Sequence, residues 1–358
     1  MKTKFLWAAL ALVLLAGCQK FGGVGSPIRF SAMTRTAGGT GTRAAYSGVL
    51  DENNYERIDW TDGDQIVMAM VHGETVSREQ QVYSITGIKD NTRYSEAGLA
   101  PYGSDTGLQW GTGDHYFWAA CPSSVTVGDH TLAGTISDTQ AQSHNSTNNS
   151  VALYDNAQSL FLFAGLKVLE SDIGDPISLD FYPMMTTFDF EVGANTTDDI
   201  IVRSFDLTTE HAAGDISNAD LRALTGDFTA TYTASSMSSP TVTTTSAIAG
   251  ENDRISGTFS PLAAVSQTKK IRFRVIALPQ AIQGLSVAFH TTESLNGAEQ
   301  NFIHRVNLKQ NNSWISFPGR GKADISGLLI PGADWTITFS GPRVQQWTVY
   351  DEVIIGVE

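Results

Sequence analysis

The sequence predicts an all-β protein, and two kinds of observation support this fold class. Short segments with alternating apolar and polar residues recur from Ala44 onward, as expected for strands with one buried face. Turn-forming pairs such as Asp62-Gly63 and Thr86-Gly87 separate these segments, and sustained helical periodicity is almost absent. We therefore expect two consecutive antiparallel β-sandwich domains in a chain of 358 residues.

The charge and the cysteine content restrict the class of protein further. The chain carries 37 acidic against 23 basic residues, which gives a net charge of −14. Such a surface repels phosphate backbones, so we expect no nucleic-acid partner. Of the 2 cysteines, Cys18 lies at the end of the leader described next, so we expect no intramolecular disulfide with Cys121.

Residues 1–17 have the pattern of a secretory signal peptide. Lys2 and Lys4 precede an apolar run that is too short to span a bilayer. The run ends in Leu15-Ala16-Gly17-Cys18, which resembles a bacterial lipobox. The resemblance implies cleavage before Cys18, attachment of acyl chains such as palmitate at that residue, and export as an outer-membrane lipoprotein.

After the leader we expect a tether and two domains. Residues 18–43 form a lipidated tether, in which the stretch from Ile28 to Met33 is predicted as a short strand with Ile28, Phe30 and Met33 as its large apolar residues. Residues 44–175 form the first sandwich and residues 176–358 the second. The boundary is placed where Asp, Gly and Pro cluster between Ser171 and Pro176.

Each predicted strand is a short alternating or apolar run between turn residues. In the first domain these runs are Arg57–Trp60, Gln65–Val71, Gln81–Ile85, His115–Ala120 and Ser159–Val168. In the second they are Ile177–Phe181, Thr187–Val192, Ile200–Leu207, Asp227–Tyr232, Arg254–Phe259, Ile271–Leu278, Leu285–Thr291, Phe302–Leu308, Ala323–Leu329, Trp335–Phe339 and Trp347–Val357. The Ser- and Thr-rich stretch from Ala234 to Ser246 is predicted as a long loop or hairpin tip.

No catalytic motif is present, and we expect neither enzymatic activity nor a cofactor. His115 and Cys121 share one predicted strand and could form a base and nucleophile pair, but the apolar residues between them favour a buried thiol.

One weak candidate for a metal site is a group of three aspartates. Asp59, Asp62 and Asp64 could supply oxygen ligands to Ca²⁺. Asp62-Gly63 is also a strong hairpin signal, so a structural turn is the favoured interpretation and no metal is expected.

The order of several motifs resembles a known family. Thr42–Gly48, Ile58–Ile66, Tyr116–Pro122, Ile177–Val192 and Ile315–Pro331 occur in the order seen in the fimbrillin-like surface lipoproteins of Bacteroidetes. The resemblance implies transthyretin-like sandwiches and a structural or adhesive subunit of cell-surface fimbriae, or pili. Its implied partners are other fimbrial subunits, the outer membrane and a surface receptor.

The resemblance also implies an assembly mechanism. An arginine-specific protease cuts the tether, the first strand leaves, and a strand of another subunit takes its place by β-augmentation. Here Arg43 is the better match for the cleavage position and Arg35 the second, with Ile28 to Met33 as the strand removed. The alternative is that both arginines only solvate a linker.

The C-terminus offers a segment that could be donated. Apolar side chains occupy alternate positions of this segment, interrupted by Asp351. They are Trp347, Val349, Val353, Ile355 and Val357. One face could fill pockets in a neighbouring subunit, or the segment could be the last strand of its own sandwich. Whether the protein is a stalk, anchor or tip subunit stays open.

The alternative interpretation is that the protein is an outer-membrane lipoprotein that binds glycans. The chain has 7 tryptophans, and an exposed indole can stack on a sugar ring. Trp60, Trp110 and Trp118 lie in strand-like sequence contexts, where tryptophan more often packs in a core.

Overall fold

The computed structural model is built almost entirely of strands. It describes residues 23–34, 45–50, 56–73, 78–90, 95–148, 151–155, 160–174, 176–209, 223–237, 240–244, 253–310, 313–317, 319–332 and 337–346. Within these ranges the helical content is the short 3-10 helix η3 (Glu170–Asp172). The all-β class predicted from the sequence is confirmed.

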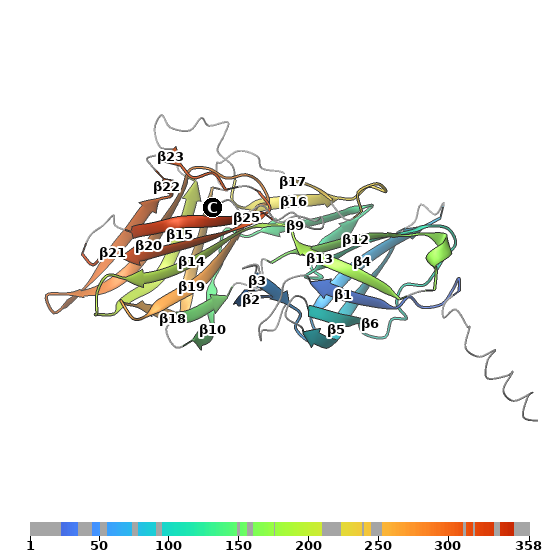
Figure 1. The fold of residues 1–358 in the computed structure, drawn as a ribbon, viewed down its shortest axis with the longest axis horizontal. Coiled ribbons are helices and arrows are strands. Elements are labelled where there is room, and N and C mark those ends of the chain that lie inside the picture. The colour runs from blue at the N-terminus through green and yellow to red at the C-terminus, as the bar shows by residue number, and fades with distance from the viewer. Residues whose placement is uncertain are drawn as a thin grey trace, which may run out of the picture.

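The first structural unit is a closed barrel, coloured mostly blue and green in Figure 1. Its strands, in spatial order, are β1 (Phe30–Thr34), β13 (Ile177–Pro183), β12 (Leu162–Val168), β7 (His115–Cys121), β4 (Gln65–His72), β5 (Glu79–Asp90) and β6 (Ser95–Pro101). All neighbouring pairs are antiparallel except β1 and β13, which run parallel.

The second unit is a 10-stranded sheet. Its strands, in spatial order, are β21 (Ala298–Asn307), β20 (Leu285–Leu295), β15 (Ile200–Thr209), β18 (Arg254–Val265), β10 (Gln142–Asn148), β11 (Val151–Asp155), β19 (Lys270–Ala277), β14 (Thr186–Ala194), β24 (Gly321–Leu329) and β25 (Ile337–Gln346). The sheet folds over on itself, because Phe273 of β19 packs against Phe205 of β15 and Phe289 of β20, with ring centroids 4.8 and 6.0 Å apart.

Three small sheets complete the structure. The 4-stranded sheet contains β17 (Thr241–Thr244), β16 (Gly226–Thr231), β9 (Thr131–Ile136) and β8 (Thr126–Gly128). The two hairpins are β2 (Ala45–Leu50) with β3 (Glu56–Asp59), and β22 (Lys309–Gln310) with β23 (Ser313–Trp314). Strand β17 lies in the Ser- and Thr-rich stretch that was predicted as a loop or hairpin tip.

The two halves of the chain exchange hairpins, as Figure 1 shows. Strands β10 and β11 follow β9 in the chain but lie in the large sheet, where β10 pairs with β18 and β11 with β19. In return, β16 and β17 from the second half extend the sheet of β8 and β9. The two β-units are therefore not strictly consecutive along the chain.

Strand pairing also places the boundary between the barrel and the following strands of the large sheet later in the sequence than predicted. The predicted boundary lies between residues 175 and 176, but β13 begins at Ile177 and still belongs to the barrel. After β13 the chain passes to the large sheet with β14, following Met184 and Met185, which are both buried in the core that includes the barrel. The Asp, Gly and Pro cluster near Ser171 is a turn between two barrel strands.

Candidate functional site: a groove filled by the first strand

The strand β1 completes the barrel by joining two strands that do not otherwise pair. It runs antiparallel to β6, with Phe30 opposite Leu99, and parallel to β13, with Phe30 opposite Ile177. Figure 1 shows β1 beside β13 and β6. Without β1, two strands would each present a row of unpaired backbone N–H and C=O groups to the same gap. We call this gap between β6 and β13 the β1 groove.

The inward face of β1 is fully packed. Ile28 and Phe30 are each 6% exposed, and Ala32 and Thr34 are 0% exposed. The alternate residues are different, since Arg29 is exposed and Met33 is half-buried. The structure thus places the strand at Phe30–Thr34, with Met33 on its outward face.

Phe30 occupies the wide end of the β1 groove. Its ring makes edge-to-face contacts with Tyr83 and Phe117, at centroid distances of 5.4 and 5.5 Å. The hydroxyl of Tyr83 accepts a hydrogen bond from the backbone N–H of Leu108 at 2.8 Å, and burial raises the pKa of Tyr83 to about 12. Burying a phenylalanine side chain in such a pocket stabilises the fold by roughly 1.5–3 kcal/mol.

The other end of the β1 groove is narrow and polar. Ala32 lies opposite Ala97, and its carbonyl accepts a hydrogen bond from the indole N–H of Trp60 at 3.2 Å. The hydroxyl of Thr34 donates to the carbonyl of Ile58 at 2.6 Å. Ile58 and Trp60 lie at the end of the β2–β3 hairpin, so this hairpin holds the end of β1.

Backbone hydrogen bonds also hold the residues that precede β1. The N–H of Ile28 donates to Leu108 at 2.9 Å, and the N–H of Gly25 donates to Trp110 at 2.6 Å. In return, the N–H of Trp110 donates to Ser26 at 3.0 Å. The whole stretch from Gly25 to Thr34 is therefore bound by contacts that another extended segment could reproduce.

An aromatic and histidine cluster lies behind the wide end. Phe117 stacks on His115, which stacks on His72 with ring centroids 5.1 Å apart. His115 is fully buried, and its Nε2 accepts a hydrogen bond from the N–H of Gly111 at 3.0 Å. Burial lowers the pKa of His115, and the nearby His72 lowers it further.

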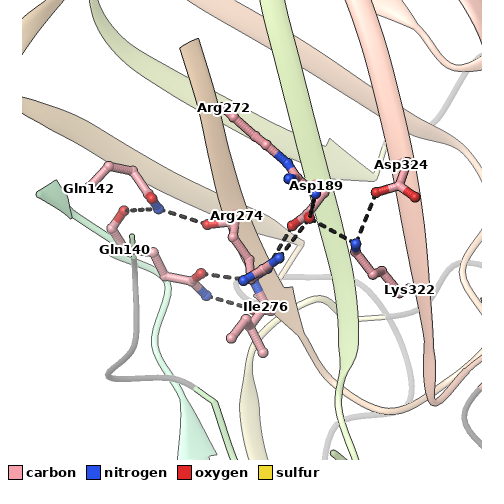
Figure 2. Close-up of polar contacts among 8 residues, drawn as sticks. All are labelled: Gln140, Gln142, Asp189, Arg272, Arg274, Ile276, Lys322 and Asp324. Atoms are coloured by element: carbon pink, nitrogen blue, oxygen red, sulfur yellow. Dashed lines mark hydrogen bonds and ion pairs between the residues drawn. The ribbon is translucent and has the colours of Figure 1, made fainter. Parts of the chain in front are cut away.

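A second polar cluster lies where β14, β19 and β24 meet, on the sheet face opposite Phe273 (Figure 2). Asp189 accepts two hydrogen bonds from Arg274, at 2.6 and 2.7 Å, and one from Arg272 at 3.1 Å. Lys322 lies 3.1 Å from the same carboxylate and 3.2 Å from Asp324. Burial acts to raise the pKa of Asp189, but the adjacent cations outweigh it and hold that pKa well below its usual range.

Two glutamines connect this cluster to the first half of the chain. The side chain of Gln140 donates to the carbonyl of Ile276 at 2.6 Å and accepts from its N–H at 3.0 Å, as a neighbouring strand would. Gln142 donates to the carbonyl of Arg274 at 2.8 Å. The cluster is thus a buried structural connection between the exchanged hairpin and the large sheet.

Only some of the remaining predicted site residues lie within the described residues. Cys18, Arg35, Arg43 and the C-terminal candidates from Trp347 onward lie outside the described residues. Cys121 is buried in the barrel core, as expected for a structural thiol.

The aspartate group has the geometry of a turn. Asp59 and Asp64 are buried, whereas Asp62 is exposed, and Asp64 accepts a hydrogen bond from the N–H of Thr61 at 2.9 Å. Among the residues that the structure describes, no set of three or more His, Cys, Asp or Glu side chains could hold a metal ion. No long apolar helix suited to crossing a membrane occurs within the same described ranges.

The barrel and sheet arrangement has known structural counterparts. A candidate cell adhesion protein from Bacteroides ovatus superposes with a TM-score of 0.51 and 13% sequence identity, covering 91% of this chain and 99% of that chain. A candidate cell adhesion protein from Bacteroides uniformis gives a TM-score of 0.48 and 16% identity over 90% of this chain and 99% of that chain. A fimbrial assembly protein from Parabacteroides distasonis gives 0.35 and 8% identity over 92% and 98% of the two chains.

The similarity to the Bacteroides ovatus protein, with its TM-score of 0.51, shows the fold. The chain is an all-β protein with the fold of the Bacteroides ovatus protein. No protein-family model matches the sequence. A search of curated proteins likewise gave no match.

The pKa of His115 predicts acid sensitivity. Above about pH 6.5, the ordinary pKa of histidine, the ring is neutral in both the folded and the unfolded chain. As the pH falls below that value, the unfolded chain takes up a proton that the folded chain binds less readily, so the free energy of unfolding falls. Urea denaturation at pH 7.5 and pH 5 should show this loss. In His115→Phe the loss of stability between pH 7.5 and pH 5 should be smaller than in the wild type. His144→Asn, which changes an exposed histidine, is the control and should show the wild-type loss. An unchanged pH dependence in His115→Phe would contradict the role of His115 in acid sensitivity.

The charge cluster predicts a large cost for losing its shared carboxylate. Asp189→Asn leaves Arg274 and Lys322 buried without their main anion, which should reduce the free energy of unfolding by about 3–5 kcal/mol. Asp199→Asn removes an exposed pair with Lys269 and should cost at most about 1 kcal/mol. Urea denaturation at neutral pH gives both values, and equal losses in the two variants would argue against a special role for the cluster.

Proposed function

We propose that this protein is a structural or adhesive subunit of cell-surface fimbriae, made as an outer-membrane lipoprotein and assembled by replacement of β1. The observation that carries the proposal is the position of β1, which fills a groove between β6 and β13 and is the first strand of the barrel in the chain. A cut after Arg35 or Arg43 would separate β1 from the barrel and leave every other barrel strand intact.

The physical effect of the cut is that β1 is no longer held at a high effective concentration next to its own groove. In the intact chain β1 is covalently attached to its groove, so a competing strand from solution has to overcome an intramolecular partner. After cleavage β1 becomes an ordinary peptide ligand that an incoming strand can displace. The exchange replaces one set of backbone hydrogen bonds and buried side chains by an equivalent set, so its equilibrium is set by side-chain fit.

Lipidation at Cys18 would place this reaction at the cell surface. The residues up to the cut would stay with the lipid, while the remainder of the chain enters the assembled fibre. The resemblance to the fimbrillin-like lipoproteins and the fold shared with a candidate cell adhesion protein both support this role. The three tryptophans that suggested glycan binding do not support it, since Trp60, Trp110 and Trp118 are at most 3% exposed and cannot stack on a sugar.

The proposal predicts that the β1 groove becomes accessible only after cleavage. Purified mature protein is treated with an arginine-specific protease, and the protease is then inactivated because the peptide used next contains Arg29. A biotinylated peptide spanning Ser26 to Thr34 is added afterwards. We expect capture of the peptide by the cleaved wild-type protein and none by the Arg35→Gln, Arg43→Gln double variant. Mass spectrometry of the products identifies the position that is cut.

The matched control is Arg78→Gln, which removes an arginine far along the chain from the tether and should behave as wild type. Circular dichroism confirms that the cleaved chain stays folded. A folded, cleaved protein that takes up no peptide would contradict the proposal, as would capture by the uncut double variant.

A further inference from the structure

We propose that the β1 groove takes its replacement strand from a different protein and excludes the C-terminal segment of this same chain. The inference rests on the proposed function. It names the partner by chemistry, as a strand whose alternate positions carry two large apolar residues, one small residue and one small hydroxyl residue. The pattern follows from the residues that fill the groove in the intact chain, namely Ile28, Phe30, Ala32 and Thr34.

The first half of the β1 groove requires large apolar groups. Phe30 fills the space between Tyr83 and Phe117, and both of these rings are fully buried. A small residue at the position of Phe30 would leave a cavity in an aromatic core, and such cavities cost several kcal/mol. An incoming strand therefore needs bulky side chains at its first two inward positions.

The second half of the β1 groove excludes large groups. Ala32 is fully buried opposite Ala97, and Trp60 lies close enough to donate to the carbonyl of Ala32. The Trp60 ring is itself held edge-on against Phe181 at 5.2 Å, so it cannot retreat easily. A leucine at the Ala32 position would overpack this end of the groove.

The last inward position requires a small polar group. Thr34 is fully buried, and its hydroxyl donates to the carbonyl of Ile58. Opposite it lies Ser95, which is also fully buried. An apolar residue of similar size would lose the hydrogen bond, and a carboxylate would be buried beside the main-chain carbonyl of Ile58.

None of the four inward positions carries a charge, and this excludes the C-terminal segment. Its apolar face runs through Trp347, Val349, Asp351, Val353 and Ile355 to Val357. Any four successive positions on this face include Asp351, so every register would bury a carboxylate in the groove. Burying an unpaired carboxylate is among the most unfavourable changes that a core can undergo.

The opposite face of the segment fails for the same reason. It runs through Thr348, Tyr350, Glu352, Ile354 and Gly356 to Glu358. Any four successive positions include Glu352, and the last set also includes Glu358. Reversing the strand direction does not alter the membership of these sets, so neither a parallel nor an antiparallel insertion avoids the charge.

The consequence is that the C-terminal segment of this chain does not fill the β1 groove of another copy. If its C-terminal segment is donated, the acceptor is a groove of different composition. The protein therefore occupies a junction between unlike subunits, and a fibre made only of this chain does not propagate through its C-terminus.

A peptide competition on the cleaved full-length protein tests the inference. A fluorescent peptide spanning Ser26 to Thr34 is bound first, and unlabelled peptides are titrated against it. We expect the unlabelled native peptide to compete fully and its Ala32→Leu version to bind at least tenfold more weakly. The matched control, Met33→Leu, changes the half-buried outward face and should bind as the native peptide does.

The C-terminal peptide, residues 347–358, should not displace the label at a hundredfold excess over the native peptide. An Asp351→Ala version tests whether charge is the barrier. It removes the carboxylate and puts a small residue at the third inward position after Trp347 and Val349, so we expect it to regain measurable competition. The cleaved protein alone should run as a monomer on a gel without boiling.

Two results would overturn the inference while leaving the proposed function intact. They are displacement by the native C-terminal peptide at concentrations similar to those of the β1 peptide, and equal affinity of the Ala32→Leu peptide. Failure of the native β1 peptide to bind the folded, cleaved protein is a different result, because it contradicts the proposed function itself.

Discussion

The barrel depends on the two ladders of backbone hydrogen bonds that β1 forms with β6 and β13. Buried backbone N–H and C=O groups require partners, and β1 supplies them to two strands at once. The side chains of β1 reinforce this requirement, since every inward position is filled. A single strand near the start of the chain thereby determines whether the first unit is closed, and it can be separated from the rest by one cut in the tether.

A different constraint holds the second unit to the first. The large sheet contains β10 and β11 from the first half of the chain, and the 4-stranded sheet joins β16 and β17 from the second half to β8 and β9 from the first. Gln140 and Gln142 replace part of a missing strand by pairing their amides with the backbone of β19. Asp189 and its three cationic neighbours lie on the same face, where apolar residues would otherwise be expected. The two units are therefore joined by polar contacts of defined geometry and not only by hydrophobic packing.

Much of this architecture could be predicted from local pattern. The strands with strong alternation or apolar runs, such as Gln65–His72 and Ile177–Pro183, agree with the predicted segments to within a few residues. The hairpin exchange could not be predicted, because β10 has the sequence Gln-Ser-His-Asn-Ser-Thr-Asn and shows no apolar periodicity. Its strand conformation depends on partners distant in sequence, and the same holds for the Thr-rich β17.

The candidate site was predictable in outline but not in detail. The alternating pattern that begins at Ile28 indicates a strand. Because successive side chains of a strand point to opposite faces, Ala32 and Thr34 share the inward face with Ile28, and Met33 lies on the outward face. The contributions of Trp60 and Ile58 require the β2–β3 hairpin to lie against β1, and no local signal in the sequence reports that contact.

The exchange of hairpins has a mechanical consequence. A tensile load that draws the barrel away from the large sheet acts on β10 and β11 in one direction and on β16 and β17 in the other. Separation has to rupture both sets of strand pairs together, because each hairpin remains tied to its home unit by the chain. A body linked in this way resists stretching as one piece, as the proposed role in a surface fibre requires.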